Sequence, residues 1–370
     1  MSAARSRGAR DGREPTSDDE PRDDAGQADG VRAPMPRLPW LDQPLRALVA
    51  QRPTLAHALL VTGAAGTGKR NFAMHFAQAL LCETPRDDGL ACDTCASCTY
   101  FIAGQHPDFR LIALDTPGDD GEVKHRAEIP VDDIRALREL VELTAHRGGC
   151  RVVVVDPAEG MNRAAANALL KTLEEPPPDT FLLLVSSQPR RLAATIVSRC
   201  RRVALPPPPR DAAIAWLAEQ GSVAPEQVLA QAHGAPLAAL ALADATLQDE
   251  RRGWLTALAE PRALSPSALA VRIDAVPREA RRDALAAIVD WLIAWSVDLA
   301  RVAARVPAAA NTDFAKALEA LAPKVARISL SRYHRTLLRA RARLAHPLTP
   351  RLTLEALLAD YQALFDHARR

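Results

Sequence analysis

The stretch GAAGTGKR, residues 63–70, has the residue types and spacing to hold the phosphates of a nucleotide. It fits the phosphate-binding loop pattern G-x-x-x-x-G-K, in which backbone N–H groups and a lysine surround the phosphates. The pattern continues with a serine or threonine that binds Mg²⁺, but here Arg70 follows, and a guanidinium has no acceptor for a metal ion. We interpret the stretch as a degenerate nucleotide loop that could still hold ATP passively; a glycine-rich turn without a ligand is the alternative. The residues concerned are Gly63, Gly66, Gly68 and Lys69.

The stretch RVVVVD, residues 151–156, reads as a buried strand that ends in a carboxylate, like the metal-positioning strand of nucleotide hydrolases. Asp156 either positions a metal ion or caps the turn. Hydrolysis also needs an adjacent glutamate, and Pro157 stands there instead. Glu159 would point elsewhere if the chain stays extended. Together with Arg70, these departures predict a site that does not hydrolyse ATP.

Four of the six cysteines lie between residues 82 and 98. Two C-x-x-C steps bring sulfur atoms together, and four thiolates suit a tetrahedral Zn²⁺ with no open position, which makes the ion structural. Because the N-terminus lacks an export signal, this clustering favours a metal over disulfides, with free thiols as the alternative. The predicted ligands are Cys82, Cys92, Cys95 and Cys98.

The tripeptide Ser198–Cys200, SRC, follows an apolar run and a short helix-like segment. An arginine fixed at that place could reach a phosphate across a subunit boundary and stabilise the charge on a transferring phosphoryl group. Because Arg201 and Arg202 follow, a solvated basic run is the better interpretation of Arg199 from these residues alone.

Apolar runs and helical spacing predict the elements that must position these residues. Strands alternate with helices, which predicts an α/β fold with a doubly wound parallel sheet and ligands near the carboxyl ends of its strands. The expected strands are 58–63, 108–114, 151–156 and 181–187, and the expected helices are 71–82, 131–145 and 162–175.

Composition limits the classes of protein that remain. The 370 residues allow two or three domains, and a formal net charge of +2 is too small for nucleic-acid binding by bulk charge. The sequence contains no apolar run of membrane-spanning length and no signal peptide, so we expect a cytoplasmic protein.

Changes in composition predict four segments. Residues 1–36 hold no Leu, Ile, Phe, Tyr or Trp and should be disordered, and the proline run at 205–210 marks a boundary before an almost purely helical remainder. The predicted segments are a tail at 1–36, a nucleotide-fold domain at 37–207 with a zinc module at 82–98, a helical lid at 208–248, and a C-terminal helical domain at 249–370.

Taken together, these motifs resemble the delta-prime family of bacterial DNA polymerase III clamp-loader subunits. The resemblance covers nearly all residues after the tail. It is most specific at HALLVTGAAGTGK (57–69), the four-cysteine module, AGQHPDFRLI (103–112), AAANALLKTLEEPPPDTFLLLVSS (164–187) and SRC.

The resemblance implies an AAA+ fold, in which a P-loop NTPase-like parallel-sheet domain with the zinc module precedes the helical lid and an all-α collar that forms oligomers. It also implies a DNA polymerase holoenzyme, a nucleotidyltransferase, in which gamma or tau, delta and delta-prime subunits load the sliding clamp onto primed DNA. Delta-prime subunits of this family do not hydrolyse ATP but present an arginine to a gamma or tau site. Arg199 matches that arginine, so the resemblance favours an arginine finger over a solvated basic run at this position.

The main rival within the family is an active gamma- or tau-like ATPase. Motor subunits carry a hydroxyl after the loop lysine, an Asp-Glu pair and a lid arginine; this chain has Arg70, Pro157 and Leu237 at those places. A weaker rival is a zinc-dependent DNA-binding module, which the small net charge and the few basic residues of the module disfavour.

Overall fold

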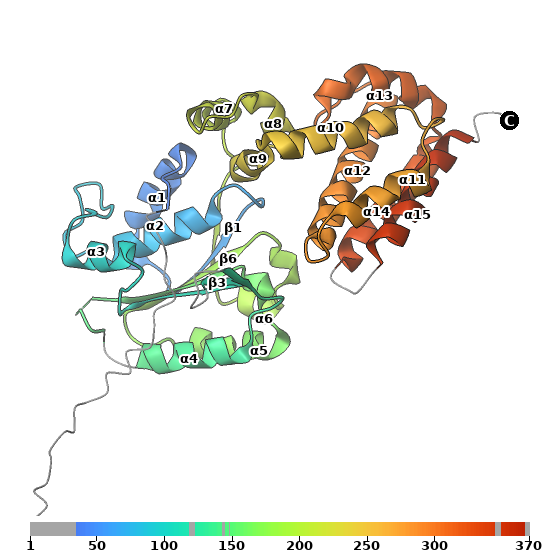
Figure 1. The fold of residues 1–370 in the computed structure, drawn as a ribbon. Helices are drawn as coiled ribbons and strands as arrows, with labels where there is room; N and C mark the ends of the chain where they lie inside the picture. Colours follow the sequence, from blue (N-terminus) through green and yellow to red (C-terminus); the bar gives the residue numbers. More distant parts are fainter. Residues whose placement is uncertain (1–34, 118–122, 143–144, 148, 345–348, 367–370) are drawn as a thin grey trace, which may run out of the picture.

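The computed structural model describes residues 35–117, 123–142, 145–147, 149–344 and 349–366. Most of the predicted disordered tail at 1–36 lies outside these residues. The described chain starts with a parallel sheet covered by helices and continues as helices alone (Figure 1). This arrangement confirms the predicted α/β class followed by helical parts. Among the described helices, none combines the length and apolar character needed to cross a bilayer.

The five-stranded sheet is parallel throughout and has the order β2-β5-β6-β1-β7. Four of its strands fall where the apolar runs predict them, and β7 is an edge strand that was not expected, because the residues RRVA carry little apolar character. The strand bounds are β1 (Ala58–Thr62), β2 (Phe109–Ala113), β5 (Arg151–Asp156), β6 (Thr180–Ser186) and β7 (Arg201–Ala204), and a separate antiparallel pair comprises β3 (Asp115–Pro117) and β4 (Val123–His125).

Helices cover both faces of the sheet (Figure 1). Successive strand residues alternate between two cores: Leu59 and Val61 pack on the α1 and α2 side, whereas Leu60 packs on the α4 and α5 side. Both faces are therefore buried, which explains the continuous apolar strand sequences. The helices of this part are α1 (Asp42–Val49), α2 (Lys69–Leu81), α3 (Ala96–Ile102), α4 (Val131–Glu142), α5 (Arg163–Glu174) and α6 (Ala194–Val197).

Three short helices form the predicted lid region and share the core of the α1 and α2 side. Trp216 of α7 meets Trp40 edge to face, with ring centroids 5.6 Å apart. The lid helices are α7 (Arg210–Glu219), α8 (Pro225–Gln231) and α9 (Pro236–Leu242).

The C-terminal helices have a core of their own, centred on Trp295, whose indole N–H donates to the Tyr361 hydroxyl at 2.9 Å. Their α-helices are α10 (Ala245–Ala259), α11 (Pro266–Ala270), α12 (Arg281–Ala303), α13 (Ala315–Leu321), α14 (Arg327–Arg343) and α15 (Pro350–Asp366). Short 3₁₀ turns occupy η1 (Pro39–Leu41), η2 (Arg52–Thr54), η3 (Ala158–Gly160), η4 (Pro189–Arg191), η5 (Val271–Ala275), η6 (Thr312–Phe314) and η7 (Ala322–Lys324). Helix α10 runs through the boundary expected between residues 248 and 249, and the domain limits stay predictions.

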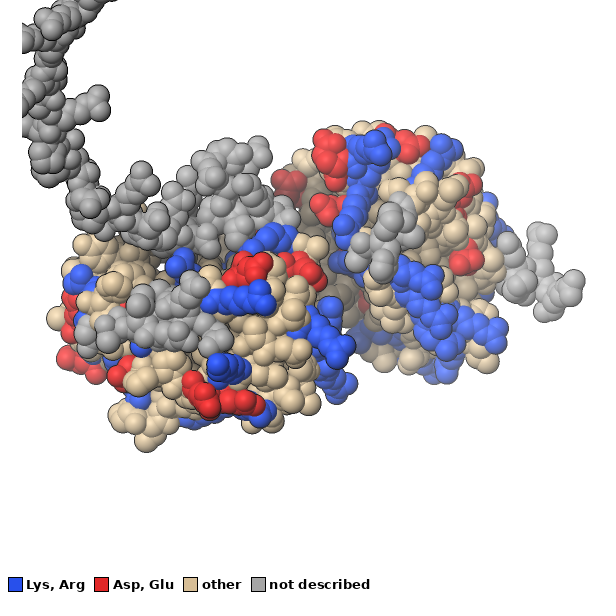
Figure 2. Space-filling view, turned by 90° about the horizontal axis from the view of Figure 1, so that it is seen from below, with Lys and Arg blue, Asp and Glu red and all other residues tan. Residues whose placement is uncertain are grey.

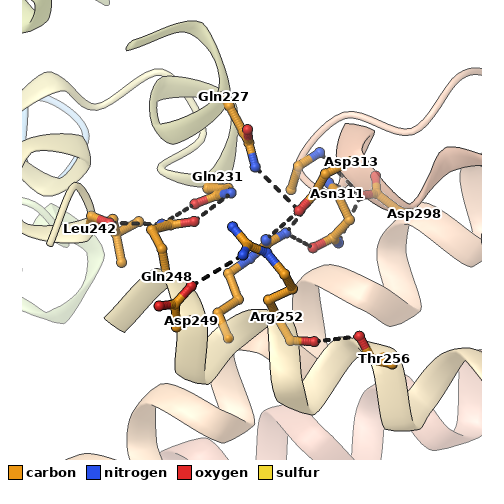
Figure 3. A network of polar contacts seen from close by, with 12 residues as sticks. Gln227, Gln231, Leu242, Gln248, Asp249, Arg252, Thr256, Asp298, Asn311 and Asp313 are labelled. Carbon is orange, nitrogen blue, oxygen red and sulfur yellow. Dashed lines mark hydrogen bonds and ion pairs between the residues drawn. The ribbon is translucent and has the colours of Figure 1, made fainter. Parts of the chain in front are cut away.

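A polar network connects the lid to the C-terminal helices (Figure 3). The buried Arg251 of α10 donates to both carboxylate oxygens of Asp313, at 2.7 and 3.1 Å, and to the Asn311 amide oxygen at 2.6 Å. Gln227 of α8 donates to Asp313 from the lid side at 3.2 Å. Since a buried arginine needs its acceptors, Arg251 holds the segment before α13 against α10, and Gln227 adds one exposed hydrogen bond from the lid.

Candidate functional site

The loop after β1 has the predicted strand–turn–helix shape, and α2 begins at Lys69 directly after it. Gly66 and Gly68 adopt left-handed backbone angles, with φ of 72° and 95°. A Cβ on Gly68 would also lie 2.3 Å from a methyl carbon of Leu38. Both glycines are therefore required by the shape of the loop, independently of any ligand.

Lys69 makes its hydrogen bond inside the loop. Its ammonium donates to the Ala64 carbonyl at 2.6 Å, and the residue is only 6% exposed. Burial lowers the pKa of Lys69, and the charges of Asp156 and Glu159 partly oppose that shift. The Lys69 ammonium is thus bonded to a backbone carbonyl, in the part of the loop where it would contact the phosphates of a nucleotide.

Arg70 and Asp156 form an ion pair across the end of the sheet. The Arg70 Nε–H donates to the Asp156 carboxylate, and Nη2 donates to the Asp156 carbonyl at 3.3 Å. The pair is possible because β1 and β5 both flank β6, so their carboxyl ends lie one strand apart. A guanidinium therefore neutralises the carboxylate that would position a metal ion.

Glu159 does not follow an extended path, because the 3₁₀ turn η3 comes directly after Pro157. Its carboxylate accepts hydrogen bonds from the backbone N–H groups of Ser187 at 3.0 Å and Gln188 at 3.1 Å. The bend also brings Glu159 close enough to Lys69 to affect its pKa. This carboxylate ties the turn after β5 to the end of β6.

The lid helix α9 packs directly on the loop. The Leu237 backbone N–H donates to the Gly66 carbonyl at 3.0 Å. A Cβ added to Gly66 would lie 2.9 Å from the Ala238 Cβ and 3.2 Å from the Ala235 Cβ. The loop is therefore a contact surface between the sheet and the lid.

The four clustered cysteines converge at the end of α2. The sulfur atoms of Cys82 and Cys95 lie 3.9 Å apart, those of Cys92 and Cys98 lie 4.0 Å apart, and all four lie within 4.8 Å of one another. A tetrahedral site with Zn–S bonds of about 2.3 Å has sulfurs about 3.8 Å apart. The cluster is thus compatible with a structural metal ion.

Hydrogen bonds prepare one of these sulfurs as a thiolate. Donation from the Thr84 hydroxyl and from the backbone N–H groups of Thr94 and Cys95 lowers the pKa of Cys92 to about 5. In contrast, burial raises the pKa of Cys200 to about 11. Cys200 and the buried Cys150 lie outside the cluster, as expected of ordinary small residues.

Arg199 lies at the surface between α6 and β7. Its Nη2 lies 2.6 Å from a carboxylate oxygen of Glu174, and its Nη1 donates to the Thr195 carbonyl at 3.0 Å. Ser198 caps the same carbonyl with its hydroxyl at 3.1 Å, while Cys200 packs against the core on the α5 side. The three residues of SRC therefore have different local contacts, and Ser198 and Arg199 are exposed whereas Cys200 is partly buried.

Arg199 and the phosphate loop lie at opposite ends of paired strands. Strands β1 and β7 are parallel, with Leu59 opposite Arg201 and Thr62 opposite Ala204. The loop follows the carboxyl end of β1, whereas Arg199 precedes the amino end of β7. The paired part of the two strands is about 10 Å long, and the two sites lie beyond its opposite ends.

Basic side chains are unevenly distributed on the face seen in Figure 2. Lys and Arg are mixed with Asp and Glu over the sheet-containing part, whereas they gather in bands over the C-terminal helices. Four arginines along α14 are exposed, which suits a solvated helix face. They are Arg332, Arg335, Arg339 and Arg343.

Sequence reasoning located the loop, the cysteines and Arg199 but missed the residues that contact them. The pairing of Arg70 with Asp156 had a signal, since Asp156 ends one parallel strand and Arg70 follows the loop after another, at the same end of the sheet. The Glu174 contact had none, because its 2.6 Å distance to Arg199 depends on how α5 and α6 pack.

Known proteins resemble this chain in sequence. The family described as DNA polymerase III, delta subunit, matches residues 45–209. A DNA polymerase III subunit delta' of Pseudomonas aeruginosa is 36% identical over 271 residues, which cover 71% of this chain and 77% of the relative. The corresponding subunit of Escherichia coli is 37% identical over 209 residues, covering 55% of this chain and 60% of the relative.

More distant similarities involve other subunit types. The DNA polymerase III subunit tau of Bacillus subtilis is 32% identical over 148 residues, which cover 40% of this chain and 24% of tau. Among solved structures, a gamma subunit-related protein of Thermotoga maritima aligns at 17% identity with a TM-score of 0.39, covering 87% of this chain and 98% of that one.

Proposed function

The chain belongs to the family of DNA polymerase III delta-prime subunits, and on that premise we propose that it is a non-hydrolysing clamp-loader subunit that supplies Arg199 to ATP held by a neighbour. The partners proposed are gamma or tau and delta subunits, with the sliding clamp and primed DNA engaged through the complex in the cytoplasm. The chain would thereby serve a DNA polymerase holoenzyme without catalysing a reaction of its own.

The separation of Arg199 from the phosphate loop carries this proposal. Because the two lie beyond opposite ends of the paired strands β1 and β7, Arg199 cannot reach phosphates in its own loop. It lies at the surface, with its side chain 35% exposed, where a neighbouring subunit can approach. An arginine finger supplied in trans needs that position.

The state of the phosphate loop supports the non-hydrolysing part of the proposal. Lys69 is bonded to the Ala64 carbonyl, and the Arg70 guanidinium is paired with Asp156. A cation already occupies the place where Mg²⁺ and its hydroxyl ligand belong. Any ATP in this loop would be held passively, through Gly63, Gly66, Gly68 and Lys69.

ATP turnover by the purified chain tests the assignment against an active motor. We expect no Mg²⁺-dependent hydrolysis above background from the chain alone. Robust hydrolysis that Lys69→Ala abolishes would instead identify a gamma- or tau-like ATPase.

We further propose that Cys82, Cys92, Cys95 and Cys98 hold a structural Zn²⁺. Their sulfur spacing fits the ion, and four protein ligands leave no position for a reaction. Elemental analysis should find stoichiometric zinc, which Cys95→Ser loses and Cys200→Ser retains. Zinc-free protein with an unchanged melting temperature after chelation would contradict the proposal.

A further inference from the structure

We propose that Glu174 is a positioning residue for Arg199, which it holds oriented toward the phosphates of a neighbouring subunit. This inference rests on the proposed function of Arg199 in trans. It concerns a carboxylate at the end of α5, which neither touches the neighbour's nucleotide in this proposal nor takes part in the reaction.

The contact joins two elements that are distant in the sequence. Glu174 is the last residue of α5, and Arg199 follows α6; Leu169 of α5 and Ile196 of α6 belong to the same buried core. The Arg199 Nη2 lies 2.6 Å from the Glu174 Oε1, the distance of a charge-assisted hydrogen bond. The arginine direction is therefore set by the packing of α5 and α6.

A second acceptor fixes the plane of the guanidinium. Arg199 Nη1 donates to the carbonyl of Thr195, a residue of α6. No helical backbone N–H reaches that carbonyl among the described contacts, because the N–H groups of Ser198 and Arg199 donate to Ala194 and Ile196. Each terminal nitrogen of Arg199 thus has one hydrogen-bond partner, and the two bonds together restrict rotation of the side chain.

The anchors leave enough donors for a phosphate. A guanidinium carries five N–H donors, and the described contacts use one each from Nη1 and Nη2. Nε–H and the second hydrogens of the terminal nitrogens remain for a ligand, which allows the two parallel bonds typical of arginine–phosphate pairs. Glu174 contacts Arg199 through a single oxygen, so the remaining N–H groups of the guanidinium stay available to a phosphate.

The functional consequence is preorganisation. A long arginine loses rotamer freedom when it meets a phosphate, and a finger that is already oriented loses less. A small displacement of a group that contacts the transition state can lower a rate strongly. Removing Glu174 should therefore reduce the turnover number of the neighbouring site rather than its affinity for ATP.

Glu175 is the matched control for Glu174. It is the adjacent carboxylate, it is exposed like Glu174, and its side chain makes no hydrogen bond or ion pair among the described residues. Replacing it removes the same charge from the same surface without touching Arg199.

The test measures clamp- and DNA-stimulated ATPase of the reconstituted complex that contains variants of this chain. We expect Glu174→Ala to lower kcat at least tenfold with little change in KM. Glu174→Gln, which retains an acceptor oxygen, should recover most of the rate, and Glu175→Ala should match the unaltered chain. The double variant Glu174→Ala with Arg199→Ala should be no slower than Arg199→Ala alone.

Each contrary result has a distinct meaning. If Arg199→Ala lowers the rate but Glu174→Ala does not, or raises it, the positioning role is wrong and the function of Arg199 stands. A double variant slower than Arg199→Ala alone would mean that Glu174 acts independently, which also overturns the inference. If Arg199→Ala itself has no effect, the proposed function fails with it.

Discussion

The phosphate loop and the Arg199 segment present cationic side chains of similar type with different partners. In the loop, Lys69 is bonded to a carbonyl of its own turn and Arg70 is paired with Asp156. Arg199 also has a carboxylate partner and, like Arg70, keeps three N–H donors without a partner among the described contacts, but its partner Glu174 is 51% exposed whereas Asp156 is 15% exposed. Lys69 is therefore buried and Arg70 is paired with a largely buried carboxylate, whereas Arg199 is paired with an exposed one.

The loop also has a structural role that does not require a nucleotide. Gly66 accepts a hydrogen bond from Leu237 and leaves no space for a side chain beside Ala238. The loop thus contributes to the packing of the lid, which gives its glycines a structural role. In the proposed function, the chemistry then depends on Arg199, whose direction is set by its contacts with Glu174 and the Thr195 carbonyl.

The largest expected effect comes from Arg199. We expect Arg199→Ala to lower the ATPase rate at the neighbouring site by about 10³-fold or more, because an arginine finger stabilises charge in the transition state. The measurement is steady-state ATPase of the reconstituted complex. Arg202→Ala, which removes another exposed arginine without a hydrogen-bond partner in the described contacts, should leave the rate unchanged, and an equal loss in both variants would point to a general charge effect.

The next effect concerns stability and the loop. Gly66→Ala places a side chain at φ of 72° and 2.9 Å from the Ala238 Cβ, so we expect a loss of about 2 kcal/mol in the free energy of unfolding. Denaturant unfolding of the purified chain measures it. Gly149→Ala, where no atom lies within 4 Å of the new Cβ, serves as the control. Equal stability of both variants would show that α9 does not depend on the loop.

A gain of function should follow when the built-in cation is removed. Arg70→Thr restores a hydroxyl and releases Asp156, so we expect Mg²⁺ to strengthen nucleotide binding by about tenfold, or 1.4 kcal/mol. Calorimetric titration with and without Mg²⁺ measures this change. Arg70→Lys keeps a cation beside Asp156 and should show no Mg²⁺ dependence; a strong dependence in the unaltered chain would contradict the account.

The smallest effect should be that of Arg199 on stability. Its ion pair with Glu174 is half exposed, and such pairs contribute about 0–1 kcal/mol. We therefore expect Arg199→Ala to change the free energy of unfolding by less than about 1 kcal/mol in the isolated chain. A larger loss would show that Arg199 is a structural residue and would weaken the contrast with the loop.

Local patterns predicted the elements well. Apolar runs located β1, β2, β5 and β6. The helix expected at 162–175 is α5, which Asn162 caps by accepting from the Ala165 N–H at 2.8 Å. Strand β7 was missed because an edge strand that begins with two arginines has no apolar periodicity. Such a strand forms through its pairing with β1, which lies far away in the sequence.

Contacts between distant segments account for the remaining differences at the site. The motif identified Arg70 as an unsuitable metal ligand, but its bond to Asp156 depends on the strand order of the sheet. Glu159 was expected to point away along an extended chain, and the η3 turn instead directs it to the N–H groups of Ser187 and Gln188. Residue types therefore predicted which groups of a nucleotide hydrolase are absent, and the fold determined which contacts the residues in their places make.

One measurement separates the two regions most directly: the ATPase rate of the same reconstituted complex with Lys69→Ala or with Arg199→Ala in this chain. The account predicts that Lys69→Ala leaves the rate near that of the unaltered complex, whereas Arg199→Ala abolishes most of the activity at the neighbouring site. A large loss with Lys69→Ala and an unchanged rate with Arg199→Ala would contradict it.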